Sequence, residues 1–275
     1  MLYKDLLKYT VTTFLVIVLL PLEATAFGVS LELNRETFSP GAVMEVTAGV
    51  SKPGSIAPVK ADVYLAVVTP DSIIYCLKGD SSVSGPNELS PLIENWAVKE
   101  IPPLTLLSFE LPAGTPMGPY TWYLVLCRPG TNMGETANWL ASAMSSLTVA
   151  KPVILVDDVK ELESIVYKDP AKIDSVEVNG DLLKIKVTYT GGCVKHDFEL
   201  IRPPEIGFAP DGPQDLTLSH DSKSDGCNEV ITQELLFDIS SFDNFWDLSQ
   251  NMPLRLWIWA SGSDKHFEPA PYWGN

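Results

Sequence analysis

The feature that most constrains the fold is a pattern of short alternating apolar and polar runs, separated by turns rich in proline and glycine. Leu31 and Leu33 share one face of the first run, and Met44 and Val46 repeat the pattern after a Ser-Pro-Gly turn at 39–41. Alternation with period two predicts strands with one buried face, and Pro-Gly pairs predict the turns between them. The chain holds 22 prolines and 18 glycines, which argues against long helices. The sequence therefore predicts an all-β protein.

The strands fall into two groups, so we expect two β-sandwich domains of immunoglobulin-like type in tandem. With the boundary near Lys151 and Pro152, one sandwich occupies 27–150 and a second β-rich domain, which carries the Cys and His-Asp motifs, occupies 151–275. In the second domain, Asn179 and Gly180 stand between two alternating runs and predict a hairpin turn, because both residue types tolerate positive φ.

A different pattern occurs at 254–259, where apolar side chains fall on both faces of the run. A strand that is apolar on both faces is covered on both sides. The sequence therefore predicts a central strand near the end of the chain.

The N-terminus has the features of a secretory signal at 1–26. Lys4 and Lys8 precede an uncharged, mostly apolar run at 9–22, and an Ala-x-Ala end follows at Ala24 and Ala26. The alternative is an uncleaved anchor, but the run is shorter than the roughly 20 residues that a membrane span needs. We therefore expect a mature chain that does not span a membrane and that is secreted, periplasmic or on the cell surface.

Charge and motif content narrow the class of function. Lys and Arg total 19 and Asp and Glu 35, a formal net charge of −16, so binding to nucleic acid is not expected because phosphates would be repelled. The sequence contains no Gly-x-Ser-x-Gly elbow, His-Glu-x-x-His helix or phosphate-binding loop. A protein without catalytic residues is the favoured interpretation.

Four cysteines become informative if the chain is exported, because an even count outside the cytoplasm favours disulfides. The pairing Cys76–Cys127 with Cys193–Cys227 is preferred, since each pair then lies within one half of the chain. The alternative is a Cys/His metal site, but no Cys-x-x-Cys occurs and the half with Cys76 and Cys127 has no His.

The first half, at roughly 29–149, resembles immunoglobulin-like modules of bacterial exported proteins. The residues that carry the resemblance are "FSPGAVMEVTAGVSKPG", "ADVYLAVVTPDS" and "PAGTPMGPYTWYLVLCRPGT", the last with a Gly-Pro-Tyr-Thr-Trp corner at 118–122. Such modules act as spacers or binding platforms, so the resemblance implies a fold more than a function.

The second half contains "YTGGCVKHDFEL" and "LSHDSKSDGCNEV". It resembles a small β domain of uncharacterised bacterial exported proteins and lipoproteins, in which a Cys-x-x-His-Asp-Phe strand start recurs with a second His-Asp and a second Cys. The resemblance implies a candidate site made of Cys193, His196, Asp197, His220, Asp221, Asp225 and Cys227.

This site permits two interpretations. In the first, His196 and His220 ligate a divalent transition metal, with Asp197 or Asp221 as a carboxylate ligand or orienting group. In the second, which we favour, the Asp side chains cap turns and the His side chains bond to the backbone beside a disulfide. No other cofactor is expected. A looser calcium site is a further alternative, built from Asp221, Asp225, Asn228 and Glu229.

Aromatic residues in turn-rich stretches offer a binding surface: Trp96, Trp139, Trp246 and Trp273. Aromatic side chains on loops suit protein or glycan contacts, although they can equally plug the ends of the two cores. The sequence thus favours an exported, non-enzymatic binding or scaffolding protein with a protein or glycan ligand. The alternative is a metal-binding exported protein, possibly a hydrolase, that uses His196 and His220.

Overall fold

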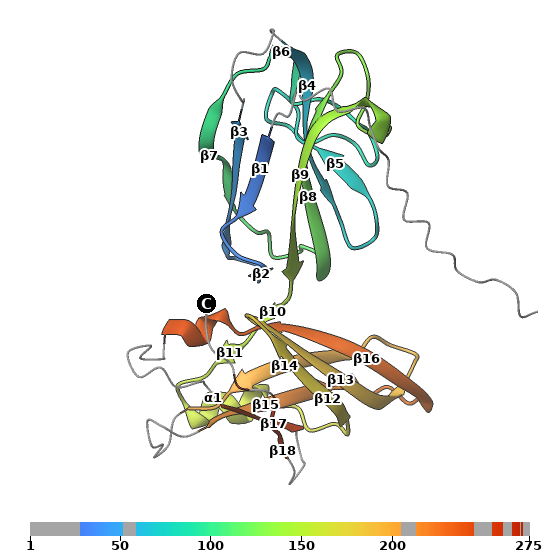
Figure 1. Cartoon of the computed structure of the whole chain (residues 1–275). Coiled ribbons are helices and arrows are strands. Elements are labelled where there is room, and N and C mark those ends of the chain that lie inside the picture. The colour runs from blue at the N-terminus through green and yellow to red at the C-terminus, as the bar shows by residue number, and fades with distance from the viewer. Residues whose placement is uncertain are drawn as a thin grey trace, which may run out of the picture.

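In the computed structural model the described residues are 28–51, 59–204, 213–244, 255–260, 266–269 and 271. The expected signal segment at 1–26 lies outside them. Figure 1 shows two β units, one above the other, that meet near the middle of the chain. Among the described residues, no helix has both the length and the apolar composition that a membrane span requires.

The N-terminal unit is a sandwich of two sheets. One sheet has the order β1-β3-β7, and the other has the order β2-β9-β8-β4-β5 with β6 also paired to β4. The bounds are β1 (Gly28–Leu33), β2 (Thr37–Phe38), β3 (Val43–Ser51), β4 (Lys60–Val68), β5 (Ile74–Cys76), β6 (Ile93–Ala97), β7 (Ile101–Glu110), β8 (Gly118–Cys127) and β9 (Trp139–Val149), with a short 3-10 turn at Thr136–Asn138.

The core of this sandwich forms because alternate residues of facing strands point inward. In β3, Met44, Val46 and Ala48 are buried while Val43 and Glu45 are exposed. They pack with Phe38 and Leu124 into one apolar cluster between the sheets. As expected, the alternation in the sequence of β3 therefore corresponds to one buried and one exposed face of the strand.

The C-terminal unit is a second sandwich, with the sheets β10-β16-β13-β12 and β11-β14-β15-β17-β18. Its bounds are β10 (Lys151–Pro152), β11 (Ile154–Leu155), α1 (Val159–Ile165), β12 (Lys172–Asn179), β13 (Leu182–Gly191), β14 (Asp197–Arg202), β15 (Gln214–Asp221), β16 (Glu229–Asp238), a 3-10 turn at Ser240–Asn244, β17 (Leu256–Ala260) and β18 (His266–Phe267).

Two local predictions for this unit are confirmed. β12 and β13 form a hairpin whose last pair is Asn179 with Leu182, and Gly180 has φ 54° in the turn between them. β17 lies between β15 and β18, with Leu256 and Ile258 fully buried and Trp257 and Trp259 partly buried on its other face. Together with the two layered units, these features confirm the all-β sandwich fold.

The expected Cys76–Cys127 disulfide is wrong: both cysteines are buried free thiols. Cys76 pairs with Ala66 on one edge of β4, and Cys127 pairs with Asp62 on the other edge. Two strand spacings of about 4.8 Å separate them, whereas bridged Cα atoms lie within about 7 Å. Burial raises the pKa of Cys127 to about 11 and also raises that of Cys76, so neither thiol is ionised at neutral pH.

Candidate functional site

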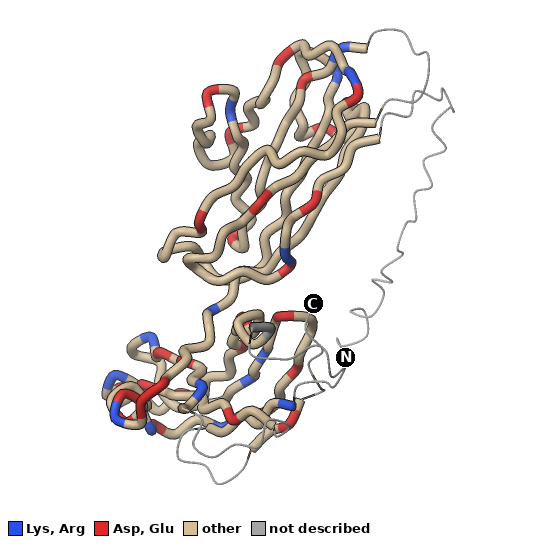
Figure 2. Tube along the Cα trace, turned by 90° about the vertical axis from the view of Figure 1, so that its left-hand side faces the viewer, with Lys and Arg blue, Asp and Glu red and all other residues tan. Residues whose placement is uncertain are grey.

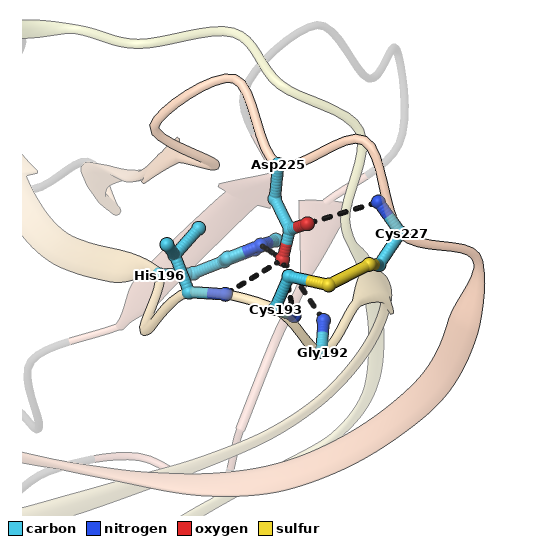
Figure 3. Close-up of a disulfide and its surroundings, with 6 residues drawn as sticks. Gly192, Cys193, His196, Asp225 and Cys227 are labelled. Carbon is cyan, nitrogen blue, oxygen red and sulfur yellow. Dashed lines mark hydrogen bonds and ion pairs between the residues drawn. A yellow bond between two sulfur atoms is a disulfide. The ribbon is translucent and has the colours of Figure 1, made fainter.

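The predicted Cys193–Cys227 disulfide is present, with a Cα–Cα distance of 5.9 Å. Cys193 lies in the turn after β13, and Cys227 lies in the loop before β16. These two strands are neighbours, and their last paired residues are Gly191 and Glu229. The disulfide therefore fastens two loops at the end of a strand pair, as Figure 3 shows.

His196 and His220 meet beside this disulfide. Their side chains are buried, and His196 Nδ1 lies 2.8 Å from His220 Nε2. His220 stacks on Phe198, its register partner in β14, with ring centroids 4.3 Å apart and an interplanar angle of 2°. The ring of Tyr189 packs against His196 at 4.7 Å. Aromatic surfaces thus enclose the two imidazoles.

Asp225 is the anion of the cluster, and its side chain is fully enclosed. Its Oδ1 accepts a hydrogen bond from the Cys227 amide at 2.9 Å, and its Oδ2 accepts from the amides of Gly192, Cys193 and Val194 at 2.9 to 3.2 Å. These hydrogen bonds, the Cys227 amide foremost, hold the pKa of the Asp225 carboxyl well below its ordinary value. Asp225 is therefore a carboxylate at neutral pH.

The histidine pair has a polar contact at each end. His196 Nε2 lies 3.2 Å from Asp225 Oδ2, and His220 Nδ1 lies 3.2 Å from the carbonyl oxygen of Asp169. Both oxygens only accept, so the outer ring nitrogens are the donors in these contacts. The inner nitrogens lie 2.8 Å apart, within hydrogen-bond distance of each other.

Burial favours the neutral form of His220. It lowers the pKa of His220, and the neighbouring His196 lowers it further. A neutral His220 with its proton on Nδ1 donates to the Asp169 carbonyl and presents Nε2 as an acceptor toward His196 Nδ1.

Steric crowding and backbone conformation explain the two glycines of the Gly-Gly-Cys sequence before the site. A Cβ on Gly191 would lie 2.5 Å from His196 Nε2 and 3.0 Å from Asp225 Oδ2. Gly192 has φ +117°, a conformation that side chains rarely adopt. Gly191 leaves room for the imidazole, and Gly192 turns the chain so that three successive amides face one carboxylate.

Asp197 and Asp221 do not join the histidines, contrary to the metal hypothesis. They are register partners at the ends of β14 and β15, one residue from Phe198 and His220, so they point to the opposite face of the sheet. Asp197 forms an ion pair with Lys223, and Asp221 Oδ1 accepts from the Lys223 amide at 2.8 Å. Both contacts are ordinary turn and surface contacts.

The facing histidine nitrogens also do not fit a shared metal ion. Two nitrogens bound to one zinc ion at about 2.0–2.1 Å lie about 3.3 Å apart or more, but His196 and His220 are 2.8 Å apart. The interpretation that we favoured, in which Asp side chains cap turns and both His side chains bond to the backbone, agrees with the contacts in part. His220 contacts the Asp169 carbonyl, whereas His196 contacts the side chains of His220 and Asp225. Nothing in the sequence pointed to Asp169, because it contributes its carbonyl from a segment 51 residues upstream.

A second feature is an apolar groove on the N-terminal sandwich, with a volume of about 120 Å³. It opens where β6 and β7 form the edges of the two sheets, and exposed Leu104 and Leu106 of β7 border it. Every lining residue is apolar: Ala48, Gly49, Val50, Val63, Leu92, Ile93, Trp96, Ile101, Leu104, Leu106, Leu124 and Leu126.

Buried Asp62 sets the local shape of β6. Its Oδ1 accepts from the Asn95 amide and its Oδ2 from the Gly130 amide, both at 2.7 Å. Asn95 has φ 54°, and the pairing of β4 with β6 shifts register between Ala61 and Val63. This kink precedes Trp96, which lies in β6 rather than in a loop as expected. Asp62 is a positioning residue that the sequence did not reveal.

Of the other three tryptophans expected to bind a ligand, the structure describes only Trp139. Trp139 begins β9, donates from Nε1 to the Met133 carbonyl at 2.8 Å and packs against the cluster that contains Cys127, so it closes a core. Trp246 and Trp273 lie outside the described residues. Of the two tryptophans that the structure describes from the expected set, Trp96 alone lines the groove.

No family model matches the sequence, and no curated protein matches it. Among solved structures, a toxin-related protein from Parabacteroides distasonis is 16% identical, with 77% of this chain and 93% of that chain covered and a TM-score of 0.37. A NigD-like immunity protein from Bacteroides caccae is 14% identical, with 78% and 93% covered and a TM-score of 0.36. A protein of unknown function from Bacteroides vulgatus is 11% identical, with 76% and 89% covered and a TM-score of 0.36.

Proposed function

We propose that this chain is an exported, non-enzymatic binding protein whose N-terminal sandwich holds an extended apolar segment of a partner protein. The observation that supports the proposal is the groove between β6 and β7, lined only by apolar residues and open to solvent beside Leu104 and Leu106. Exposed apolar surface of this kind is typical of interaction sites.

The lining favours a protein ligand over a glycan. Sugar hydroxyls need hydrogen-bonding side chains, and the groove offers them only Trp96 among apolar neighbours. An apolar side chain entering the groove needs no such partner and gains about 25 cal/mol for each Å² of apolar surface that it buries.

The backbone of β7 supports an extended ligand. Within the described residues β7 pairs with β3 and no other strand, so one edge of β7 is free to bind a peptide backbone. Pro102 and Pro103 remove amide donors from the start of this strand. The ligand therefore pairs with the remaining part, at 104–110.

The export part of the proposal rests on the signal-like segment at 1–26 and on the Cys193–Cys227 disulfide, because disulfides persist mainly outside the cytoplasm. Asp and Glu are distributed over both units in Figure 2, in keeping with the net charge of −16. A partner segment that combines apolar residues with Lys or Arg is consequently favoured over an acidic one.

The test places a photo-crosslinking amino acid at Leu104 of the full chain and exposes the protein to the native envelope fraction. The control carries the same crosslinker at Met144, which is 68% exposed on β9 of the same sandwich and does not line the groove. We expect one crosslinked polypeptide from position 104, absent from position 144 and lost on Leu106→Asp. Equal crosslinking from both positions, or binding to a glycan array that Leu106→Asp leaves intact, would contradict the proposal.

A further inference from the structure

We propose that reduction of the Cys193–Cys227 disulfide creates a zinc site held by the two thiolates, Asp225 and His196. The ligand atoms of Cys193, Asp225 and Cys227 all lie within 4.8 Å of one another. On one zinc ion, two thiolate sulfurs lie about 3.7 Å apart and a sulfur and a carboxylate oxygen about 3.5 Å apart. The three groups therefore need to move by only an ångström or two to share an ion.

His196 is the fourth donor of the proposed site, and its Nε2 has to approach the sulfurs, because only the ligand atoms of Cys193, Asp225 and Cys227 all lie within 4.8 Å of one another. Its Nε2 lies 3.2 Å from Asp225 Oδ2, which is close to the roughly 3.3 Å expected for a nitrogen and an oxygen on one tetrahedral zinc ion. Gly191 has no side chain to fill the space beside both atoms. In Figure 3, His196, Asp225 and the disulfide lie together at the ends of their loops.

His220 and Asp169 already provide the outer hydrogen bonds that such a ligand needs. With zinc on His196 Nε2, a neutral His196 has its ring proton on Nδ1 and donates it to His220 Nε2. His220 in turn still donates from Nδ1 to the Asp169 carbonyl. Zinc-bound imidazoles in proteins almost always have such a partner on the other ring nitrogen, which fixes the ring orientation.

Oxidation state decides which crosslink is present, because thiolates rather than disulfide sulfurs bind the metal. A dithiol reductant transfers two electrons and two protons to the bond, which yields two Cys thiols and converts the reductant to its own disulfide. Zinc then displaces the two thiol protons and binds His196 through Nε2, with a ring proton on Nδ1. Both cysteines lie in loops, Cys193 before β14 and Cys227 before β16, which lets the sulfurs separate.

The same two loops are then crosslinked by a disulfide under oxidising conditions and by zinc under reducing ones. His196 lies beside Asp225 in both states, as its hydrogen-bond partner in the first and as a neighbouring metal ligand in the second. This inference is independent of the groove, which lies on the other sandwich.

The experiment compares oxidised and anaerobically reduced full chain after incubation with zinc chloride and removal of unbound metal. We expect one zinc ion per reduced chain, none per oxidised chain, and release of the two thiol protons at a pH where the thiols are protonated. Cobalt in place of zinc should give thiolate-to-cobalt charge-transfer absorption in the reduced chain only. Equal metal content in both states, or a reduced chain that binds no zinc, overturns the proposal, whether or not the reduced chain stays folded.

Variants separate the site from other thiols. Cys193→Ser and Cys227→Ser should each weaken zinc binding at least 100-fold, whereas the matched controls Cys76→Ala and Cys127→Ala should retain it. His220→Gln tests a positioning role and should weaken binding 10- to 100-fold while the cobalt spectrum keeps its tetrahedral form. Zinc retention in Cys193→Ser, or its loss in Cys76→Ala, would place the metal elsewhere and contradict the assignment.

Discussion

Asp225 receives hydrogen bonds from four backbone amides and from one imidazole, although it stands in a short polar loop. These contacts stabilise the enclosed carboxylate of Asp225, because a buried charge without a partner is costly. The neighbouring Asp221 instead caps a turn at the surface. Asp221 and Asp225 are only four residues apart, but we expect only Asp225 to contribute strongly to stability.

Replacement of Asp225 by Asn removes the counterion but keeps the shape. We expect a clear decrease in the urea midpoint of unfolding, because four backbone amides and His196 lose their anionic acceptor. The matched variant Asp221→Asn should leave the midpoint nearly unchanged. Urea titrations of the oxidised protein compare the two, and equal midpoints would count against a stabilising role of the Asp225 carboxylate.

His220 gives the oxidised protein a pH dependence of defined sign. Its pKa is lowered in the folded state by burial, so below about pH 6.5 the unfolded chain takes up a proton that the folded chain resists. The contribution is fully present above pH 6.5 and falls as the pH decreases, by at most about 1.4 kcal/mol per pH unit for one proton. His220→Gln should lack this slope between pH 5 and 6.5 in urea titrations. An unchanged slope in the variant would assign the titration to another group.

At the level of elements, the turn between β13 and β14 brings the backbone of Gly191 close to the His196 ring. We expect Gly191→Ala to cost about 1–3 kcal/mol of unfolding free energy, since its Cβ would overlap His196. Gly226→Ala is the matched control in the facing loop, where no atom lies within 4 Å of the added Cβ. Denaturant unfolding should separate the two variants, and similar costs would mean that the contact with His196 does not matter.

The kink of β6 offers a second test on the other sandwich. Asp62→Ala leaves the Asn95 and Gly130 amides without their acceptor, which should cost about 1–3 kcal/mol. Hydrogen exchange should show both amides opening faster than in the wild type. Unchanged exchange at Asn95 would mean that Asp62 does not hold β6 in place.

The strands could be predicted because alternation is local. The Cys193–Cys227 pair was predicted only because both cysteines lie in one half of the chain, and the same criterion predicted the Cys76–Cys127 pair, which is wrong. The alternation in the sequence also indicates that His220 faces inward, because His220 continues the buried series of Leu216 and Leu218 along β15. The sequence did not indicate the contact with the Asp169 carbonyl or the free thiols of Cys76 and Cys127. Both depend on which strands become neighbours, and the spacing of residues along the chain does not determine that.

On the scale of the whole molecule, the two sandwiches differ in how they are held. The C-terminal sandwich has a crosslinked corner with enclosed charges, whereas the N-terminal sandwich has buried thiols without a crosslink and an open apolar edge. The proposed binding groove thus lies in the N-terminal unit, and the disulfide crosslink lies in the C-terminal unit.

Reduction of the disulfide should therefore lower the stability of the C-terminal sandwich only. Its 34-residue separation corresponds to about 3–4 kcal/mol on the chain-entropy estimate. In the presence of a metal chelator, we expect reduction to lower the unfolding transition of the C-terminal sandwich and to leave that of the N-terminal sandwich in place. Calorimetry of both forms measures this, and a joint shift of both transitions would contradict independent fastening.

Hydrogen exchange of the full chain, alone and with its crosslinked partner segment, tests the division of roles most directly. We expect amides at 104–110 of β7 to exchange at least tenfold more slowly in the complex, while amides at 191–197 and 222–228 keep their rates. Protection confined to the loops around His196 and Asp225, with β7 unchanged, would contradict the account.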